Sequence, residues 1–303
     1  MHKIIHKRKL APDTYLFEVE APLIAMSRRP GQFIMICRDS HSERIPISIA
    51  GGNSEKGTIQ FVIQAIGRTT KEITALEEGD NIENVVGPLG AESELKNFGT
   101  VVFIGGGYGV AAILPIAQAC QKLGNRVISI VGARKKELLL LLDEIKAVSH
   151  EVRISTNDGS IGIKGLVTDV LKQMIDEGVE IGKVFAIGPV PMMEAVSQLT
   201  RQYGIPTTVS LNPIMVDGTG MCGGCRVEVG GEIKFACYEG PEFDGHLVDF
   251  RSLTNRQKWY KEMEFTALKR VEGGVEIEHY FPIDENCPIE EIIRRVPINV
   301  PPE

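Results

Sequence analysis

Short apolar runs, separated by turn residues, recur at regular intervals through the first 97 residues of the chain. Such spacing without helical periodicity predicts a small antiparallel barrel. One helical interruption is expected over residues 69–76, before a last strand that closes at residues 87–90. We therefore expect an antiparallel barrel over residues 1–97, with strands at residues 14–19, 31–36, 45–49 and 58–63.

The period of the pattern changes near residue 98. Strand-like apolar runs now alternate with segments long enough for helices, which is typical of a parallel sheet with crossover helices. We expect an α/β domain over residues 98–212, with strands at 101–104, 127–131, 152–155 and 184–187 and helices at 109–123, 135–147, 165–177 and 191–203.

A glycine- and cysteine-rich stretch follows over residues 217–240. It is too small to hold a hydrophobic core of its own and needs a metal to staple it. We expect a small metal-binding domain over residues 213–250. Residues 251–303 are expected to form a charged helix over 253–269, a hairpin around Gly273 and Gly274, a short helix over 288–294 and an extended tail over 297–303. This end of the chain is predicted to contact a partner, and the alternative for the tail is a solvated segment.

Composition narrows the class of protein. The 303 residues are 43% hydrophobic and carry a formal net charge of −7, with no basic face that could release counterions from nucleic acid. We expect no nucleic-acid partner. The sequence has no apolar run long enough to span a membrane and no signal peptide, so we expect a cytoplasmic protein without membrane contact.

Three of the six cysteines are crowded between residues 222 and 237. Because thiols stay reduced in the cytoplasm, this crowding favours metal binding over disulfides. The other three are scattered and are interpreted as small buried side chains, namely Cys37, Cys120 and Cys287.

The spacing of the crowded cysteines is Asp217-x4-Cys222-x2-Cys225-x11-Cys237. Plant-type 2Fe-2S sites use C-x4-C-x2-C and a later cysteine, so an aspartate stands where the first thiolate is expected. We expect Asp217, Cys222, Cys225 and Cys237 to hold a 2Fe-2S cluster. A structural zinc site is the competing interpretation, and Asp217 could instead be a plain acidic residue in a glycine turn.

Two glycine-rich turns follow strands of the predicted parallel sheet. The first, residues 105–109, reads Gly-Gly-Gly-Tyr-Gly and opens a helix, where backbone amides favour a pyrophosphate. It departs from the dinucleotide fingerprint, because Val110 replaces the last glycine and Arg134 stands where an acid is expected after the second strand. The second turn starts at Gly188 and lies at the same sheet edge. Together they indicate a nucleotide site, whereas the first turn alone could be structural.

Two segments of the barrel are candidates for a flavin site. Residues 44–48 combine a cation, apolar residues and a hydroxyl, and residues 67–70 place a glycine and two threonines at a helix start. The structural alternatives are a surface charge and a plain helix cap.

The order of barrel, nucleotide domain and cluster loop resembles the ferredoxin-NADP reductase superfamily. Within it, the chain is most similar to the small-subunit family of NADH-dependent ferredoxin:NADP oxidoreductases, which are electron-bifurcating transhydrogenases. Dihydroorotate dehydrogenase electron-transfer subunits and sulfide dehydrogenase beta subunits are further relatives. The resemblance covers roughly residues 5–265 and rests most specifically on residues 217–225, 235–237 and 240–245.

The resemblance implies three cofactors: FAD, NAD(H) and a 2Fe-2S cluster. Dihydroorotate-type relatives carry four cysteines, so Asp217 favours the transhydrogenase group. Residues implied at FAD are Arg44, Pro46, Ile47, Ser48, Ile63, Ala65, Gly67, Thr69 and Thr70. Residues implied at NAD(H) are Gly105, Gly106, Gly107, Gly109, Val110, Asp158, Gly188, Pro189 and Met192. Ile187 stands where many reductases have a cysteine beside the nicotinamide.

A nicotinamide gives up two electrons as hydride, whereas an iron-sulfur cluster carries one at a time, and a flavin converts between the two. We therefore expect hydride exchange between NAD(H) and FAD, single-electron exchange between FAD and the cluster, and no catalytic acid or base. By the resemblance, the cluster would face a larger iron-sulfur flavoprotein subunit, with ferredoxin as an indirect partner. The alternatives are a dihydroorotate or sulfide dehydrogenase partner and, in another class, a zinc-stapled nucleotide-binding regulatory subunit without redox turnover.

Overall fold

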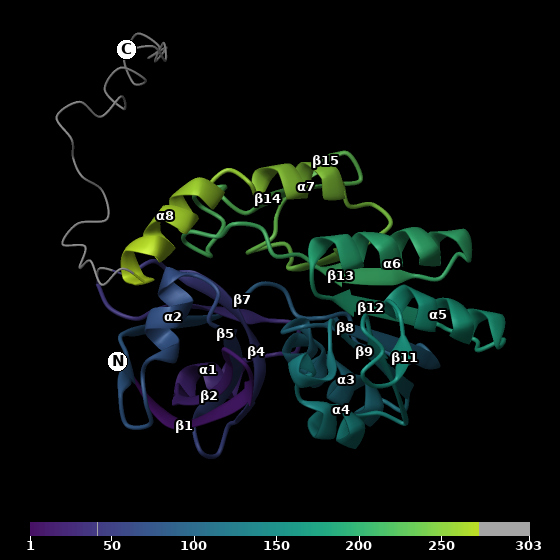
Figure 1. Ribbon diagram of the computed structural model, residues 1–303, viewed down its shortest axis with the longest axis horizontal. Helices are drawn as coiled ribbons and strands as arrows, with labels where there is room; N and C mark the ends of the chain where they lie inside the picture. Colours follow the sequence, from purple (N-terminus) through teal and green to yellow (C-terminus); the bar gives the residue numbers. More distant parts are fainter. Residues whose placement is uncertain (41, 273–303) are drawn as a thin grey trace, which may run out of the picture.

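Seven antiparallel strands build the first part of the chain, which lies at the lower left of Figure 1. The structure is a computed structural model that describes residues 1–40 and 42–272. The strand order is β6-β1-β2-β5-β4-β3-β7, and Glu83 alone separates β6 from β7 in sequence, so the two edges of the sheet meet in a near-closed barrel. The strands are β1 (His2–Ala11), β2 (Thr14–Glu20), β3 (Phe33–Cys37), β4 (Ile45–Asn53), β5 (Thr58–Gln64), β6 (Asn81–Ile82) and β7 (Asn84–Leu89).

The predicted antiparallel barrel is confirmed, with two elements that the sequence pattern did not reveal. Strand β1 carries many basic residues, and only Ile4 and Ala11 are buried in it, so its apolar alternation is weak. Helix α1 (Pro22–Ser27) is six residues long and begins with proline in its first turn. The predicted helical interruption is α2 (Arg68–Thr74).

The α/β part lies at the lower right of Figure 1 and is a seven-stranded sheet in the order β11-β10-β9-β8-β12-β13-β16. All its neighbours pair in parallel except β13 and β16, which are antiparallel. The strands are β8 (Thr100–Gly106), β9 (Arg126–Ala133), β10 (Glu151–Thr156), β11 (Ile163–Lys164), β12 (Lys183–Ile187), β13 (Thr207–Ser210) and β16 (Glu242–Asp244). The helices are α3 (Gly109–Lys122), α4 (Leu142–Val148), α5 (Val167–Asp176) and α6 (Val190–Gln202).

The single helix predicted over residues 135–147 is wrong. A short 3-10 turn, Lys136–Leu138, comes first, and α4 begins only at Leu142. Leu141 has a left-handed φ of 52°, which breaks the helix. The side chains of Leu140 and Leu141 are buried in the core beneath α3 and α4, and their burial accounts for the turn of the chain at this point.

Two hydrophobic cores hold the α/β sheet between the other parts of the chain. Helices α3 and α4 share one core with barrel residues that include Leu16 and Val62. Helices α5 and α6 share the other with residues of the cysteine-rich segment, among them Cys225 and Val227. Burial of these shared apolar surfaces fixes the positions of the three parts relative to one another.

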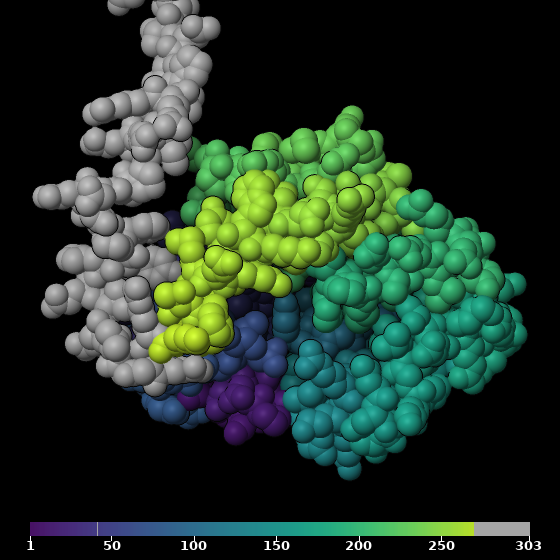
Figure 2. Space-filling view, turned by 45° about the horizontal axis from the view of Figure 1, so that its top comes forward, coloured from purple at the N-terminus to yellow at the C-terminus, as the bar shows by residue number. Residues whose placement is uncertain are grey.

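The cysteine-rich segment and the helices after it lie along the top of Figure 1. The hairpin of β14 (Arg226–Val229) and β15 (Glu232–Phe235) follows the cysteine loop, which spans residues 216–224, and β16 then joins the edge of the α/β sheet. The one helix predicted over residues 253–269 is instead two, α7 (Phe250–Arg256) and α8 (Lys261–Glu272). Phe250 and Leu253 hold α7 on the core, whereas α8 crosses toward α2 of the barrel (Figures 1 and 2).

Several predictions for the end of the chain lie outside the described residues. These are the hairpin at Gly273 and Gly274, the helix over 288–294, the tail over 297–303 and the burial of Cys287. Among the helices of the described residues, none is both long and apolar enough to cross a membrane.

Candidate functional site

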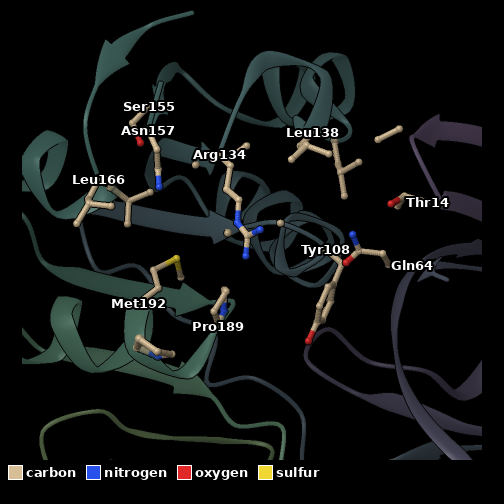
Figure 3. Close-up of a pocket in the computed structure, with 18 of the residues that line it drawn as sticks. Thr14, Gln64, Tyr108, Arg134, Leu138, Ser155, Asn157, Leu166, Pro189 and Met192 are labelled. Carbon is tan, nitrogen blue, oxygen red and sulfur yellow. The ribbon is translucent and has the colours of Figure 1, made fainter. Parts of the chain in front are cut away.

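A cavity of about 600 Å³ opens between the barrel and the carboxyl ends of the parallel strands (Figure 3). Ligands bind at this edge in open α/β sheets, because the loops that leave adjacent strands diverge there. Gly106, Gly132 and Ser155 bring the ends of β8, β9 and β10 to its wall, and Pro189 follows β12. Thr14 and Gln64 close it from the barrel side.

The turn from β8 into α3 is built by close backbone approach. A Cβ on Gly109 would lie 2.2 Å from the carbonyl oxygen of Ile187, so a side chain here would push the start of α3 away from the end of β12. Gly106 and Gly107 line the cavity directly, and among the described residues no side chain caps the N-terminus of α3. The bare positive end of the helix therefore faces the space where a phosphate would be stabilised.

Not every residue predicted at this site lines the cavity. Val110 is 1% exposed and packs in the core, where it would contact a Cβ on Gly105. The Asp158 carboxylate accepts hydrogen bonds from the backbone N–H and hydroxyl of Ser160, at 2.9 and 2.7 Å, and these bonds lower its pKa. Its neighbour Asn157 lines the cavity instead.

Polar and aromatic side chains define the inside of the cavity. Arg134 points into its middle, and Tyr108 stands toward the barrel side with its ring along the wall (Figure 3). Met192 and Pro189, both predicted at the site, form the opposite wall. Sequence reasoning did not single out Tyr108, although it lies inside the glycine turn, or Asn157, which is adjacent to a predicted residue.

A second, smaller cavity of about 130 Å³ adjoins the first at Tyr108, which lines both. Pro46, Ile47 and Ser48 face it from β4 of the barrel. Gly109 and Gly188, from the two glycine turns, face it from the α/β side, together with Ser210, Asn212 and Met215, which the sequence did not single out. The predicted flavin strand and both glycine turns thus meet at one place.

The first half of β4 is apolar but is not fully buried by the rest of the protein. Ile45, Pro46 and Ile47 are apolar, yet all three remain partly exposed, and Ser48 is exposed. The second half of the same strand buries Ile49 and Ala50 in the usual way. An apolar strand face that opens onto a cavity fits a flat aromatic ring such as that of a flavin.

The remaining predicted flavin residues do not line the small cavity, and their exposures differ. Arg44 is exposed just before β4, whereas the Ile63 side chain is buried in the barrel core. The Thr70 hydroxyl caps α2 by accepting from the Gly67 N–H at 2.9 Å, and Thr69 is buried at the same helix start. Ala65 donates its N–H to the carbonyl of Asp13 at 2.7 Å.

The cysteine loop is organised around Asp217. Its carboxylate accepts hydrogen bonds from the backbone N–H groups of Thr219 and Cys222, both at 2.9 Å. These two bonds, the Thr219 amide first, lower the pKa of Asp217 and keep it ionised. The carboxylate therefore folds the loop that carries Cys222, and it lies within the segment that presents the thiols.

Two of the three predicted thiol ligands are in contact. The sulfurs of Cys225 and Cys237 are 3.1 Å apart and buried, and burial followed by this hydrogen bond raises the pKa of Cys237 to about 12. Cys222 is exposed. Within residues 1–40 and 42–272 no three His, Cys, Asp or Glu side chains converge tightly enough for a single metal ion.

Backbone N–H groups of the loop point at the sulfurs. The N–H of Gly224 lies 3.4 Å from the sulfur of Cys222, and the N–H of Cys237 lies 3.4 Å from the sulfur of Cys225. Such donors stabilise negative charge on sulfur and tune iron-sulfur clusters. The chemistry of the donor set, three thiols and a carboxylate beside amides aimed at sulfur, fits a 2Fe-2S cluster.

The cysteine loop sits directly on the barrel and beside the second cavity. Gly218 has a φ of 77°, and a Cβ there would lie 2.7 Å from Met35 of β3 and 3.0 Å from Leu89 of β7. Met215, two residues before Asp217, lines the second cavity. The cluster loop and the β4 cavity are thus separated by a few packed side chains.

The carboxyl group of Glu242, a partly buried residue of β16, joins the barrel side to the edge of the α/β sheet. Its Oε1 accepts a hydrogen bond from the Ser93 hydroxyl at 2.7 Å and lies near the turn at Gly31 before β3. Burial raises the pKa of Glu242 to about 7, against the opposing effects of Ser93 and Lys183. No local pattern in the sequence indicates this group, because its environment forms only when β16 joins the sheet.

Comparisons with known proteins agree with this geometry. Residues 212–249 match the family described as the iron-sulfur cluster binding domain of dihydroorotate dehydrogenase B. The chain is 44% identical over 270 residues to the dihydroorotate dehydrogenase B (NAD(+)) electron transfer subunit homolog of Thermotoga maritima, which covers 89% of this chain and 95% of that protein. It is 33% identical over 254 residues to the dihydroorotate dehydrogenase B (NAD(+)) electron transfer subunit of Desulforamulus reducens, over 81% of this chain and 96% of that one.

A solved structure resembles the whole described fold. It comes from work on flavin-based electron bifurcation by the NADH-dependent reduced ferredoxin-NADP oxidoreductase. The match has a TM-score of 0.86 and 42% sequence identity, and it covers 90% of this chain and 98% of the other.

Proposed function

The chain belongs to the family of dihydroorotate dehydrogenase B electron transfer subunits and their homologues, within the ferredoxin reductase superfamily, and we propose that it passes electrons between NAD(H), FAD and a 2Fe-2S cluster. The observation that carries this proposal is that the three candidate sites lie next to one another, in the order large cavity, small cavity and cysteine loop. Tyr108 lines both the large and the small cavity, and Met215 joins the small cavity to the cysteine loop.

The bound flavin would supply the conversion between a two-electron hydride and single electrons. The protein contributes position and shielding. Pro46, Ile47 and Ser48 offer a flat, partly exposed strand face on one side, and Gly109 and Gly188 allow close approach on the other. Among the described residues, Tyr108 is the only ionisable side chain that lines the small cavity.

The large cavity is proposed to bind the nicotinamide dinucleotide. Its pyrophosphate would lie against Gly106 and Gly107 at the end of α3, and Arg134 would lie within reach of the same phosphates or of the ribose. Three predicted residues would stabilise this site without contacting the nucleotide. Gly105 and Val110 pack against each other in the core, and Asp158 is hydrogen-bonded in the turn at Ser160.

The cysteine loop is proposed to hold the 2Fe-2S cluster on Cys222, Cys225, Cys237 and Asp217. The match to an iron-sulfur cluster binding domain supports this assignment over a structural zinc ion, and with it the redox function over a regulatory one. Asp217→Cys is expected to keep the cluster and change its absorption and electron paramagnetic resonance (EPR) spectra, and unchanged spectra would remove Asp217 from the ligand set.

An electron-transfer subunit works with a larger catalytic partner. We propose that this partner is a larger iron-sulfur flavoprotein, as in NADH-dependent ferredoxin-NADP oxidoreductase, with ferredoxin as an indirect partner, in the cytoplasm. The 42% identity to a chain of that oxidoreductase structure supports it. A dihydroorotate dehydrogenase partner is the second candidate, because the matching cluster-domain family bears that description. A sulfide dehydrogenase partner remains a further alternative.

Affinity purification of the tagged chain from its native host tests the partner. Co-purification of a flavoprotein that reduces ferredoxin with NADPH, while NAD+ accepts the other electrons, supports the first candidate, whereas a complex that oxidises dihydroorotate or sulfide would overturn it. A purified chain without flavin or iron-sulfur absorption would defeat the redox function altogether.

A further inference from the structure

Two arginines hold the peptide groups between Cys222 and Cys225. The Nη1 of Arg226 donates to the carbonyl oxygen of Gly223 at 2.9 Å, and the Nη2 of Arg256 donates to that of Gly224 at 3.1 Å. These are the only two residues between the cysteines, so each of the two spacer carbonyls has a guanidinium group as its partner.

The hydrogen bonds act on the sulfurs through the peptide plane. The carbonyl of Gly223 and the N–H of Gly224 belong to one peptide group, which accepts from Arg226 on one side and faces the sulfur of Cys222 on the other. A peptide that accepts from a cation becomes a better donor at its N–H, because the bonds of such a chain polarise one another. Arg226 therefore strengthens the N–H donor aimed at this sulfur.

Helix α7 holds Arg256 in position, and among the described residues no carboxylate pairs with its guanidinium group. It ends α7, which Asp249 caps by accepting from the Ser252 N–H at 2.8 Å and which Leu253 anchors in the core. Its guanidinium also stacks on Trp259, 4.8 Å from the ring centre. In the part of the chain that the structure describes, no carboxylate pairs with Arg226 or Arg256.

The two cations repel one another in the protein as it stands. Burial and then the positive charge of Arg226 lower the pKa of Arg256. A cavity of about 260 Å³, lined by both arginines and by Cys222, opens beside them. Thiolates and a carboxylate that ligate iron would supply the negative charge that this pair lacks.

We propose that Arg226 and Arg256 are positioning residues of the cluster, which fix the Cys222–Cys225 peptides and raise its reduction potential by compensating negative charge. This inference rests on the proposed 2Fe-2S site. Reduction adds a negative charge to the cluster, so a nearby cation stabilises the reduced form more than the oxidised form. Arg256 is the better shielded of the two, because it is half-buried whereas Arg226 is exposed, and it has the larger effect.

The test is a redox titration of the purified full chain, with the cluster followed by EPR and the flavin by absorption. Arg256→Gln is expected to shift the cluster midpoint to lower potential and to leave the flavin midpoint unchanged. Arg256→Lys keeps the charge, so its cluster midpoint is expected to stay close to that of the wild type. Arg251→Gln, at the exposed start of the same helix, removes an equal charge as the matched control and leaves both midpoints unchanged.

The outcomes separate the inference from the proposed function. An unchanged cluster midpoint in Arg256→Gln, or an equal shift in Arg251→Gln, would overturn the inference while the cluster assignment stands. A wild-type chain with no cluster signal would overturn the proposed function itself. Should Arg256→Gln fail to retain the cluster, the exposed Arg226→Gln gives the second measurement, with a smaller shift in the same direction expected and no shift contradicting the inference.

Discussion

The nucleotide cavity and the cysteine loop are built by opposite means. Strand ends and tight glycine contacts form the cavity, and its walls belong to cores that exist without any ligand. The loop over residues 216–224 buries only Gly218 and depends on backbone hydrogen bonds to Asp217 and two arginines. A nucleotide thus meets a site that is already formed, whereas the cluster completes the site that binds it.

The largest effect is expected from a substitution that disrupts the cluster site and leaves the nucleotide cavity intact. Cys225→Ser removes a buried thiol from the Cys225–Cys237 pair, so we expect complete loss of cluster iron and increased amide exchange over residues 213–240. Flavin content should stay near one per chain, because the cavity has its own core. Iron analysis and hydrogen exchange measure both effects.

Cys37→Ser is the matched control for this substitution. The Cys37 thiol donates to the carbonyls of Asp39 and Ser42, and a hydroxyl can make the same bonds. It should retain iron and flavin. Equal loss of flavin and iron in Cys225→Ser would show that the two regions are not independent.

The next largest effect is expected from a substitution in the glycine turn of the nucleotide site. Gly109→Ala places a Cβ 2.2 Å from the Ile187 carbonyl, and such overpacking is expected to cost about 3 kcal/mol of the free energy of unfolding and at least tenfold in affinity for NAD(H). Denaturant unfolding and nucleotide titration measure the two quantities.

Gly107→Ala serves as its comparison. Gly107 has a φ of 56°, but a Cβ added there would meet no atom of the described residues within 4 Å, so only the backbone cost of about 1 kcal/mol is expected. If Gly109→Ala proved no worse than Gly107→Ala, the close approach of the two glycine turns would not be essential.

Stability of the contact between the barrel side and the edge of the α/β sheet should depend on pH through Glu242. Its folded pKa, about 7, lies above the ordinary value of 4.5, so the folded state keeps the proton over a range in which the unfolded state has lost it. The contribution of the protonated group is fully present below pH 4.5 and is lost as pH rises through 7. The shift corresponds to about 3 kcal/mol at most, which partial solvation reduces to about 2 kcal/mol.

Glu242→Gln removes this titration and keeps an oxygen that can accept from Ser93. The difference in the free energy of unfolding between the variant and the wild type should grow in favour of the variant from pH 5 to pH 8. Denaturant unfolding across this range checks it, and a difference independent of pH would contradict the buried state of the carboxyl group.

The smallest expected effect tests whether backbone groups, and not side chains, provide most of the affinity of the cavity for NAD(H). Arg134 is exposed, so Arg134→Ala should weaken NAD(H) binding by about 1 kcal/mol or less, roughly fivefold. Isothermal titration measures it at two salt concentrations, and the effect should shrink at high salt. A loss above a hundredfold would mean that the side chain dominates recognition.

The sequence predicted the features that depend on local pattern. The change from period-two runs to alternating strands and helices located the barrel and the parallel sheet, and the spacing of Cys222, Cys225 and Cys237 located the loop. Features that depend on tertiary pairing could not be predicted. Strand β16 becomes an edge of the α/β sheet only through contact with β13, and this pairing brings the partly buried Glu242 against Ser93.

Side-chain direction was a second limit of the sequence. Nothing in the pattern distinguishes Ile47, which packs at the margin of the barrel core and lines a cavity, from Ile63, which is fully buried in that core. Similarly, Asp158 and Asn157 are adjacent, and only the local turn at Ser160 decides which of them faces the nucleotide cavity. The helix predicted over 253–269 failed for a related reason, since the anchoring of Phe250 and Leu253 in the core fixes α7 apart from α8.

Anaerobic titration of the purified chain with NADH tests the central claim that the two regions form one electron path. Absorption follows the flavin and EPR follows the cluster in the same sample. We predict that NADH bleaches the flavin and that the signal of a reduced 2Fe-2S cluster appears with it, whereas Cys225→Ser shows flavin bleaching alone. Flavin reduction in the wild type with an intact cluster that stays oxidised, even when dithionite can reduce it and the NADH/NAD ratio is high, would contradict the account.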